Sequence, residues 1–172
     1  MSVSLYCAGP VDFNEKSYYD IIEGLITDEV PVTLFRPGMA FKVKGDVEPN
    51  YLVDVNMEAM MRSDIVVFYL NNSKTCGMWM ESVWALNGKK RMVFYMESGI
   101  RQSLYMKWVA SMKGAKWITN IQEFAKVLNE QIQQANAENF MDITEEFTLG
   151  ESLTDFAGVD VTHTDCKGCR HE

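Results

Sequence analysis

The sequence predicts an α/β fold, a doubly wound parallel sheet with helices on both faces, and three observations lead to this prediction. Short apolar runs typical of buried strands recur along the 172 residues, the clearest being Ile65 to Leu70. Segments with apolar residues at helical spacing separate these runs. Because neighbouring parallel strands need a crossover connection, strands that alternate with helices favour a parallel sheet.

The first half of the chain supplies two strands and two helices. Ser2 to Cys7 alternates in polarity and predicts a first strand, which ends in the tight loop Ala8-Gly9-Pro10. Residues 15–28 have the apolar spacing of a helix, and Val30 to Phe35 reads as a second strand. The next helix is predicted over residues 49–62.

The second half continues the alternation. After the strand Ile65 to Leu70 comes a helix that carries Glu81 in its first turns and ends at Asn87-Gly88, and then a strand over residues 90–96. Residues 99–112 predict a helix whose apolar side holds four large residues: Leu104, Trp108, Val109 and Met112.

A short fifth strand over residues 115–118 and a last helix complete the prediction. Thr119 is the predicted N-cap of this helix, which we expect to run to about Gln134. The whole is a flavodoxin-like or Rossmann-like domain with a five-stranded parallel sheet, over residues 1–134.

The remaining residues, 135–172, form an acidic C-terminal arm. Residues 136–172 hold nine acidic side chains against Lys167 and Arg170, which accounts for −7 of the chain's net charge of −8. The segment is either an extended arm that lies on a neighbouring subunit or a partly disordered tail, and the sequence leaves both open.

Composition narrows the classes of function. A net charge of −8 argues against nucleic acid or an anionic membrane as a partner, and no apolar run reaches transmembrane length. The first residues lack the features of a signal peptide, so we expect a cytoplasmic protein with reduced cysteines. The tail holds weak metal-ligand candidates, but their spacing favours a solvated tail over a zinc site: His163, Cys166, Cys169 and His171.

Glu81 is the first candidate for chemistry. It follows the carboxyl end of a predicted parallel strand, which is where open α/β sheets bind ligands. We expect the helix N-terminus to keep its carboxylate ionised, so that it could attack an electrophile. The alternative is a helix whose first turns happen to be acidic.

Three segments together resemble one enzyme family. They are Leu5-Tyr6-Cys7-Ala8-Gly9-Pro10, Asn56 with Asp64 eight residues later, and Gly77-Met78-Trp79-Met80-Glu81. Over about residues 3–118 they are similar to the nucleoside 2-deoxyribosyltransferase superfamily, which includes the 2′-deoxynucleoside 5′-phosphate N-hydrolases.

The resemblance implies cleavage of an N-glycosidic bond without a cofactor. Glu81 would attack C1′ of a deoxynucleoside or its 5′-monophosphate, with Tyr6 orienting the carboxylate, and the sugar would pass to a free base or to water. A transferase is the first hypothesis and an N-hydrolase the second. A non-catalytic nucleotide-binding module is the alternative from another class.

Further substrate contacts follow from the same resemblance. Gly9 and Gly77 belong to the matching motifs, and Asn56 stands where the family usually has an aspartate. An amide can hydrogen-bond a base but cannot act as a general acid. Thr75 favours a nucleotide, since the N-hydrolases bind the 5′-phosphate with a hydroxyl residue at its position.

The resemblance also implies a homo-oligomer with a shared active site. In this family a neighbouring subunit completes the site, and the matching region makes Ser103 and Met106 the candidates, although an ordinary amphipathic helix explains them equally well. Asp12 would repel a substrate phosphate unless a cation intervenes, and Arg36 or Arg101 could supply it.

Overall fold

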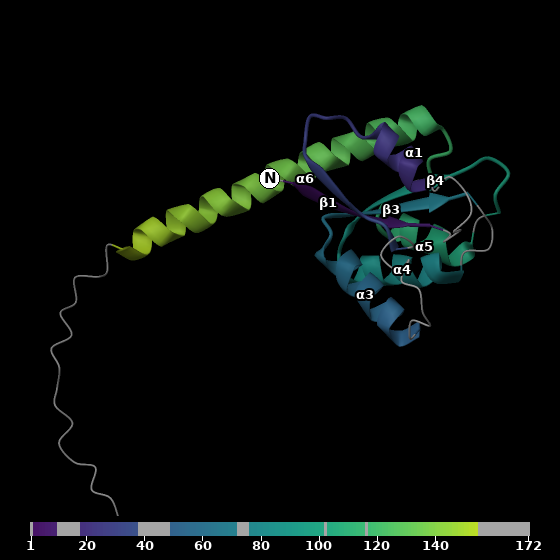
Figure 1. Ribbon diagram of the computed structural model, residues 1–172, viewed down its shortest axis with the longest axis horizontal. Helices are drawn as coiled ribbons and strands as arrows, with labels where there is room; N and C mark the ends of the chain where they lie inside the picture. Colours follow the sequence, from purple (N-terminus) through teal and green to yellow (C-terminus); the bar gives the residue numbers. More distant parts are fainter. Residues whose placement is uncertain are drawn as a thin grey trace, which may run out of the picture. The chain divides into compact units, whose positions relative to one another are not determined.

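The computed structural model describes residues 2–9, 18–37, 49–71, 76–101, 103–115 and 117–154. Its strands and helices follow one another in this order (Figure 1): β1 Val3–Ala8, α1 Tyr18–Leu25, β2 Val32–Phe35, α3 Pro49–Arg62, β3 Ile65–Leu70, α4 Cys76–Asn87, β4 Arg91–Met96, α5 Leu104–Met112 and α6 Ile121–Thr154. The chain divides into two compact units, Met1–Asn139 and Phe140–Glu172, and the α/β fold belongs to the first.

The sheet has four parallel strands in the order β2-β1-β3-β4. The α/β class and the parallel sheet are therefore confirmed, but the predicted fifth strand is wrong. Ile118 makes only an isolated parallel bridge to Tyr95, in which Met96 N donates to Ile118 O (2.9 Å) and Ile118 N donates to Phe94 O (3.1 Å).

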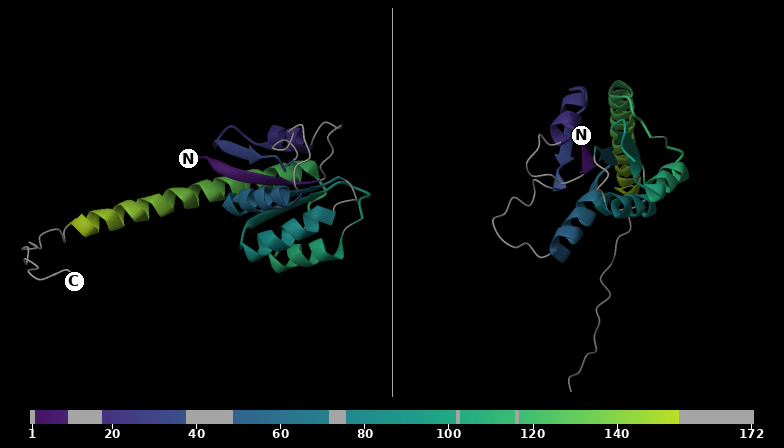
Figure 2. Two further views of the ribbon diagram at one scale, coloured as in Figure 1. Left: turned by 60° about the horizontal axis from the view of Figure 1, so that its bottom comes forward. Right: turned by 90° about the vertical axis from the view of Figure 1, so that its right-hand side faces the viewer.

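Helices cover both faces of the sheet, as predicted. Successive strand residues point to opposite faces. Leu5 and Cys7 pack with α1 and α6, whereas Tyr6 and Ala8 pack with α3, α4 and α5. Figures 1 and 2 show α3, α4 and α5 together on one side of the strands and α1 on the other.

This arrangement creates a topological switch point between β1 and β3. The two strands are neighbours, with Tyr6 beside Val66 and Ala8 beside Phe68. The chain leaves β1 toward α1 on one face and leaves β3 toward α4 on the other. Ligands of open α/β sheets bind in the crevice that such diverging connections open at the carboxyl ends of the strands.

Helix α5 differs from its prediction in both start and orientation. It begins at Leu104, and its buried side is formed by Met106, Val109 and Ala110. Leu104, Trp108 and Met112, which we expected on the buried side, are 79%, 51% and 61% exposed. The helix is apolar nearly all round, so its apolar spacing alone does not identify the stripe that faces the core.

Helix α6 also differs from its prediction at both ends. Asn120, rather than Thr119, caps its start, because Asn120 Oδ1 accepts hydrogen bonds of 2.9 Å from the backbone N–H groups of Gln122 and Glu123. The helix continues to Thr154 instead of ending near Gln134. The proposed role of residues 135–172 as an acidic arm stays a prediction.

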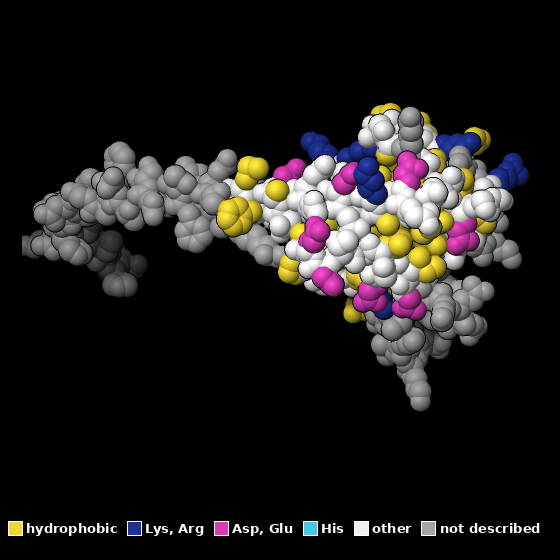
Figure 3. All heavy atoms as spheres, turned by 90° about the horizontal axis from the view of Figure 1, so that it is seen from above, with side chains coloured by type: hydrophobic (Ala, Val, Ile, Leu, Met, Phe, Trp, Pro, Cys, Tyr) yellow, Lys and Arg dark blue, Asp and Glu magenta, His cyan; other side chains and the backbone are white. Residues whose placement is uncertain are grey.

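The described surface over α1 and α6 carries acidic and basic side chains that are interspersed with apolar ones (Figure 3). Among the described residues, no helix combines the length and the apolarity needed to cross a bilayer.

Candidate active site

Tyr6 and Glu81 meet at the centre of the candidate site. Tyr6 is fully buried on β1, and its Oη donates a hydrogen bond of 2.6 Å to Oε1 of the partly buried Glu81 on α4. The ring of Phe35 stacks on Tyr6 with centroids 5.6 Å apart, which holds the phenol in place. A hydrogen bond this short is typical of an ionised acceptor.

Burial raises the pKa of the Glu81 carboxyl above its ordinary value, and the hydrogen bond from Tyr6 partly opposes this rise. The expectation that the helix N-terminus keeps Glu81 ionised stays a prediction, and the hydrogen bond from Tyr6 is the contact that lowers the pKa of this carboxyl. Helix α4 begins at Cys76, and the effect of the helix dipole falls off beyond the first turn, which holds no acidic residue. Burial and the nearby carboxylate raise the pKa of Tyr6, so its hydroxyl keeps the proton that it donates.

Gly9 lies immediately after β1 and against the ring of Tyr18. A Cβ atom at Gly9 would stand 2.2 Å from Tyr18 Cζ, which no real contact allows. Tyr18 is held there because its Oη donates a hydrogen bond of 2.8 Å to the carbonyl of Cys7. The position thus needs glycine for packing, whether or not it also contacts a substrate.

Asn56 lies on α3, one turn before the fully buried Met60, and so on the side of the helix that faces Tyr6 and the sheet. Its Oδ1 atom is buried and has no hydrogen-bond partner among the described residues. A buried acceptor without a donor is costly and is often satisfied by a ligand or water.

Asn71 shares this property and was not among the predicted site residues. It follows β3 directly, beside the switch point, and its Oδ1 is likewise buried without a partner in the described part of the chain. The only signal in the sequence was a polar residue immediately after a buried parallel strand.

For the other predicted substrate contacts, the structure shows no side-chain hydrogen bond to the Tyr6 hydroxyl or the Glu81 carboxylate among the described residues. Thr75 lies outside the described residues, and Gly77 is exposed, with open space where a Cβ would stand. Ser103 is the N-cap residue of α5, but its side chain makes no capping hydrogen bond. Met106 is fully buried in its own chain's core, which corrects the expectation that it faces a neighbouring subunit.

The weak metal-ligand candidates of the tail all lie outside the described residues: His163, Cys166, Cys169 and His171. Within the described part of the chain, no group of three or more His, Cys, Asp or Glu side chains is placed to hold a metal ion.

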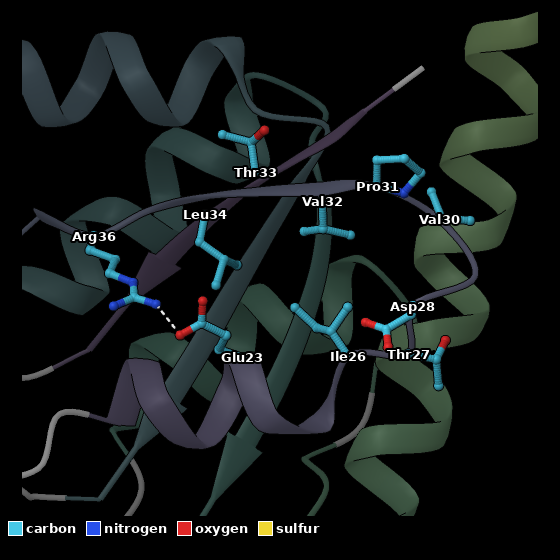
Figure 4. A pocket seen from close by; sticks show the side chains of 10 residues that line it. All are labelled: Glu23, Ile26, Thr27, Asp28, Val30, Pro31, Val32, Thr33, Leu34 and Arg36. Atoms are coloured by element: carbon cyan, nitrogen blue, oxygen red, sulfur yellow. Dashed lines mark hydrogen bonds and ion pairs between the residues drawn. The ribbon is translucent and has the colours of Figure 1, made fainter.

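Arg36 forms ion pairs with two carboxylates of α1. It contacts Asp20 at 3.8 Å and Glu23 more closely, and it stacks over Tyr19. Figure 4 shows it in a groove of about 570 Å³ between α1 and β2. The suggestion that Arg36 supplies a cation for a phosphate stays a prediction. Arg101 is exposed at the carboxyl end of the sheet.

The solved structures that share this fold include the following two. One is a conserved protein from Enterococcus faecalis V583, with a TM-score of 0.59 and 15% identity, covering 78% of this chain and 99% of that chain. The other is the CMP N-glycosidase BcmB from Clostridium botulinum, with a TM-score of 0.51 and 13% identity, covering 73% of this chain and 98% of that chain. At such identities the likeness establishes the fold alone. No protein-family model and no curated protein matches the sequence.

Proposed function

We propose that this protein cleaves the N-glycosidic bond of a 2′-deoxynucleoside or a nucleoside 5′-monophosphate. The observation that carries the proposal is the hydrogen bond between Tyr6 and Glu81, at the sheet edge where ligands of this fold bind. It is supported by the fold that the chain shares with BcmB, a CMP N-glycosidase.

In the first step of the proposed reaction, a carboxylate oxygen of Glu81 attacks C1′ of the sugar. The bond from C1′ to the base nitrogen breaks, and its electron pair leaves with the base, which takes a proton from outside this pair. Tyr6 orients the carboxylate and stabilises its charge in the free enzyme. Asn56 can hydrogen-bond the base but cannot supply the proton.

In the second step, the glycosyl group leaves Glu81. Attack on C1′ by a nitrogen of another base gives transfer, and attack by water gives hydrolysis; in both, the C1′–O bond breaks and the carboxylate is restored. Transfer is the first candidate. Hydrolysis of a nucleoside monophosphate is the second, favoured by the fold shared with a CMP N-glycosidase. Neither step uses a cofactor.

The test is base release from CMP, dCMP and the four deoxynucleosides, with and without an added free base. We expect Glu81→Gln to lower kcat/KM by about 10³-fold or more, since the nucleophile is lost. Glu130→Gln, which removes an exposed carboxylate on α6, is the matched control and should keep full activity. Absence of release from every substrate would refute the enzyme, and release that survives Glu81→Gln would refute the mechanism.

We further propose that the protein is a homo-oligomer that pairs through α4 and α5. Tyr105 and Trp108 are 65% and 51% exposed, and the Tyr105 ring lies 5.6 Å from that of Trp79 on α4. With Leu104 and Met112, these side chains expose several hundred Å², because one large aromatic carries about 150–250 Å². A standard interface buries about 800 Å² per partner, so these side chains would supply the apolar centre of the interface and polar neighbours its rim.

Sedimentation equilibrium tests the pairing. Trp108→Lys should convert the oligomer to a monomer, whereas Ile21→Lys, an exposed apolar position on α1, should leave the mass unchanged. A monomeric wild-type protein, or an oligomer that survives Trp108→Lys, would contradict this surface.

A further inference from the structure

Asn71 holds a buried acceptor that the described part of the chain does not satisfy. Its Oδ1 is shielded from solvent and lacks a hydrogen-bond donor there. Native proteins pair nearly all such atoms, and an exception points to water, an ion or a ligand. Because an amide oxygen only accepts, the missing partner must present an N–H or an O–H group.

The backbone places Asn71 at the switch point. The pairing of β3 with β4 continues to Leu70, the last residue of β3, whose carbonyl accepts a hydrogen bond of 2.9 Å from Glu97 N. Asn71 comes next, at the carboxyl end of β3 and beside the end of β1, which carries Tyr6. This is the edge of the sheet over which a ligand of this fold lies.

The hydroxyl of Tyr69 on β3 already donates its proton to another residue. Tyr69 Oη donates its proton to Glu97 Oε1 at 3.0 Å, and burial and this carboxylate raise the pKa of Tyr69. Tyr69 therefore offers no second proton to Asn71, and Glu97 is itself an acceptor. The donor for Asn71 Oδ1 is best supplied by a bound molecule.

We propose that Asn71 is a substrate-contacting residue that accepts a hydrogen bond from a secondary hydroxyl of the sugar. This rests on the proposed function. Asn71 directly follows β3, while Glu81 lies in the second turn of α4 and is bonded to Tyr6 on the neighbouring strand β1. Because both residues belong to the carboxyl edge of β1 and β3, we assign Asn71 to the part of the substrate that becomes bound to Glu81, which is the sugar. A phosphate oxygen is excluded, because a phosphate dianion has no hydrogen to donate.

The experiment is a cycle of protein and ligand changes. Binding and kcat/KM are measured for CMP, dCMP and 3′-deoxy-CMP with the wild type, Asn71→Leu and Asn71→Asp. For the wild type, we expect the affinity and kcat/KM to be about 10-fold or more lower with the analogue that lacks the contacted hydroxyl than with the parent nucleotide. Asn71→Leu should lower the affinity and kcat/KM for the parent nucleotide by the same factor and leave the values for that analogue unchanged. Asn71→Asp keeps an acceptor oxygen and should retain the preference for the parent nucleotide over the analogue.

A second pair of ligands and a stability measurement distinguish the sugar contact from a base contact and from a structural role. UMP replaces the amino group of CMP by an oxygen. If Asn71→Leu lowered the affinity for CMP but not for UMP, Asn71 would contact the base, and the sugar contact would be overturned. Equal losses for all nucleotides in Asn71→Leu, or a lower Tm than the wild type, would point to a structural residue and overturn it too.

The two proposals fail separately. If the protein turns over a nucleotide but the effect of Asn71→Leu does not depend on a sugar hydroxyl, the contact is refuted and the proposed function stands. Hydroxyl-dependent binding through Asn71 without turnover refutes the function and leaves the contact standing. Neither binding nor turnover refutes both.

Discussion

Tyr6 Oη lies 2.6 Å from Glu81 Oε1, a hydrogen bond that joins residues 75 positions apart in the chain. The fold makes this pair, because β1 lies beside β3 and the connection after β3 leads into α4. The carboxylate thereby gains its one identified donor among the described residues, in a site whose burial works against its charge.

Replacing Tyr6 by Phe should shift the pH dependence of activity. The hydrogen bond from Tyr6 lowers the pKa of Glu81, so its loss should move the acidic limb of kcat/KM to higher pH. Hydrogen bonds to charged groups contribute about 1.5–3 kcal/mol, which predicts that kcat/KM falls by about 10–100-fold at pH values on the acidic limb. The measurement is a pH profile of kcat/KM.

Tyr69→Phe is the control for this shift, because it removes a hydroxyl that is bound to Glu97 rather than to Glu81. It should leave the acidic limb in place. An unchanged limb in Tyr6→Phe would mean that the two residues are not coupled in the working enzyme.

Glu81→Gln should stabilise the protein at neutral pH. Burial raises the pKa of Glu81 in the folded state above its unfolded value of 4.5, so the folded protein binds more protons between the two values. Stability therefore falls as pH rises through that window, and a neutral amide escapes this loss. Urea unfolding at neutral pH and near pH 4.5 measures it, with the largest gain at neutral pH. A gain that grows toward acid would reverse the sign and contradict the argument.

Gly9→Ala should destabilise the fold. The new Cβ would overlap the ring of Tyr18, which would have to move and loosen its bond to the Cys7 carbonyl. Overpacking of this kind costs about 1–3 kcal/mol, measurable by urea unfolding. Gly24→Ala is the matched control, because nothing lies within 4 Å of its added Cβ and alanine favours a helix; it should be neutral or stabilising. Equal effects of the two substitutions would contradict the packing role.

Asn120→Ala should cost about 1 kcal/mol, because Asn120 Oδ1 satisfies two N–H groups at the start of α6. Thr119→Ala should change the free energy of unfolding by less than about 0.5 kcal/mol, as exposed positions away from a cap usually do. A larger cost for Thr119→Ala than for Asn120→Ala would return the cap to the residue that the sequence suggested.

The comparison of α3 and α5 shows which parts of the fold could be predicted. The limits of α3, residues 49–62, match the prediction, because its apolar spacing lies between a proline and a buried strand. For α5 the apolar residues surround the helix, so only its packing against β4 and α4 selects Met106 and Val109 over Trp108 for the core. The isolated bridge at Ile118 likewise depends on how two neighbouring turns close.

The α/β class, the alternation of strands with helices and the position of Glu81 after a buried strand could be read from the amino-acid sequence, because apolar periodicity and strand ends are local properties. The sequence also singled out Tyr6 and Asn56 through their motifs. The hydrogen bond from Tyr6 to Glu81, the burial that raises the pKa of Glu81 and the unpaired buried Oδ1 of Asn71 in the described chain became apparent only from the three-dimensional structure. The physical reason is that a pKa and a hydrogen bond depend on atoms within a few ångströms, and here these come from residues far apart in the chain.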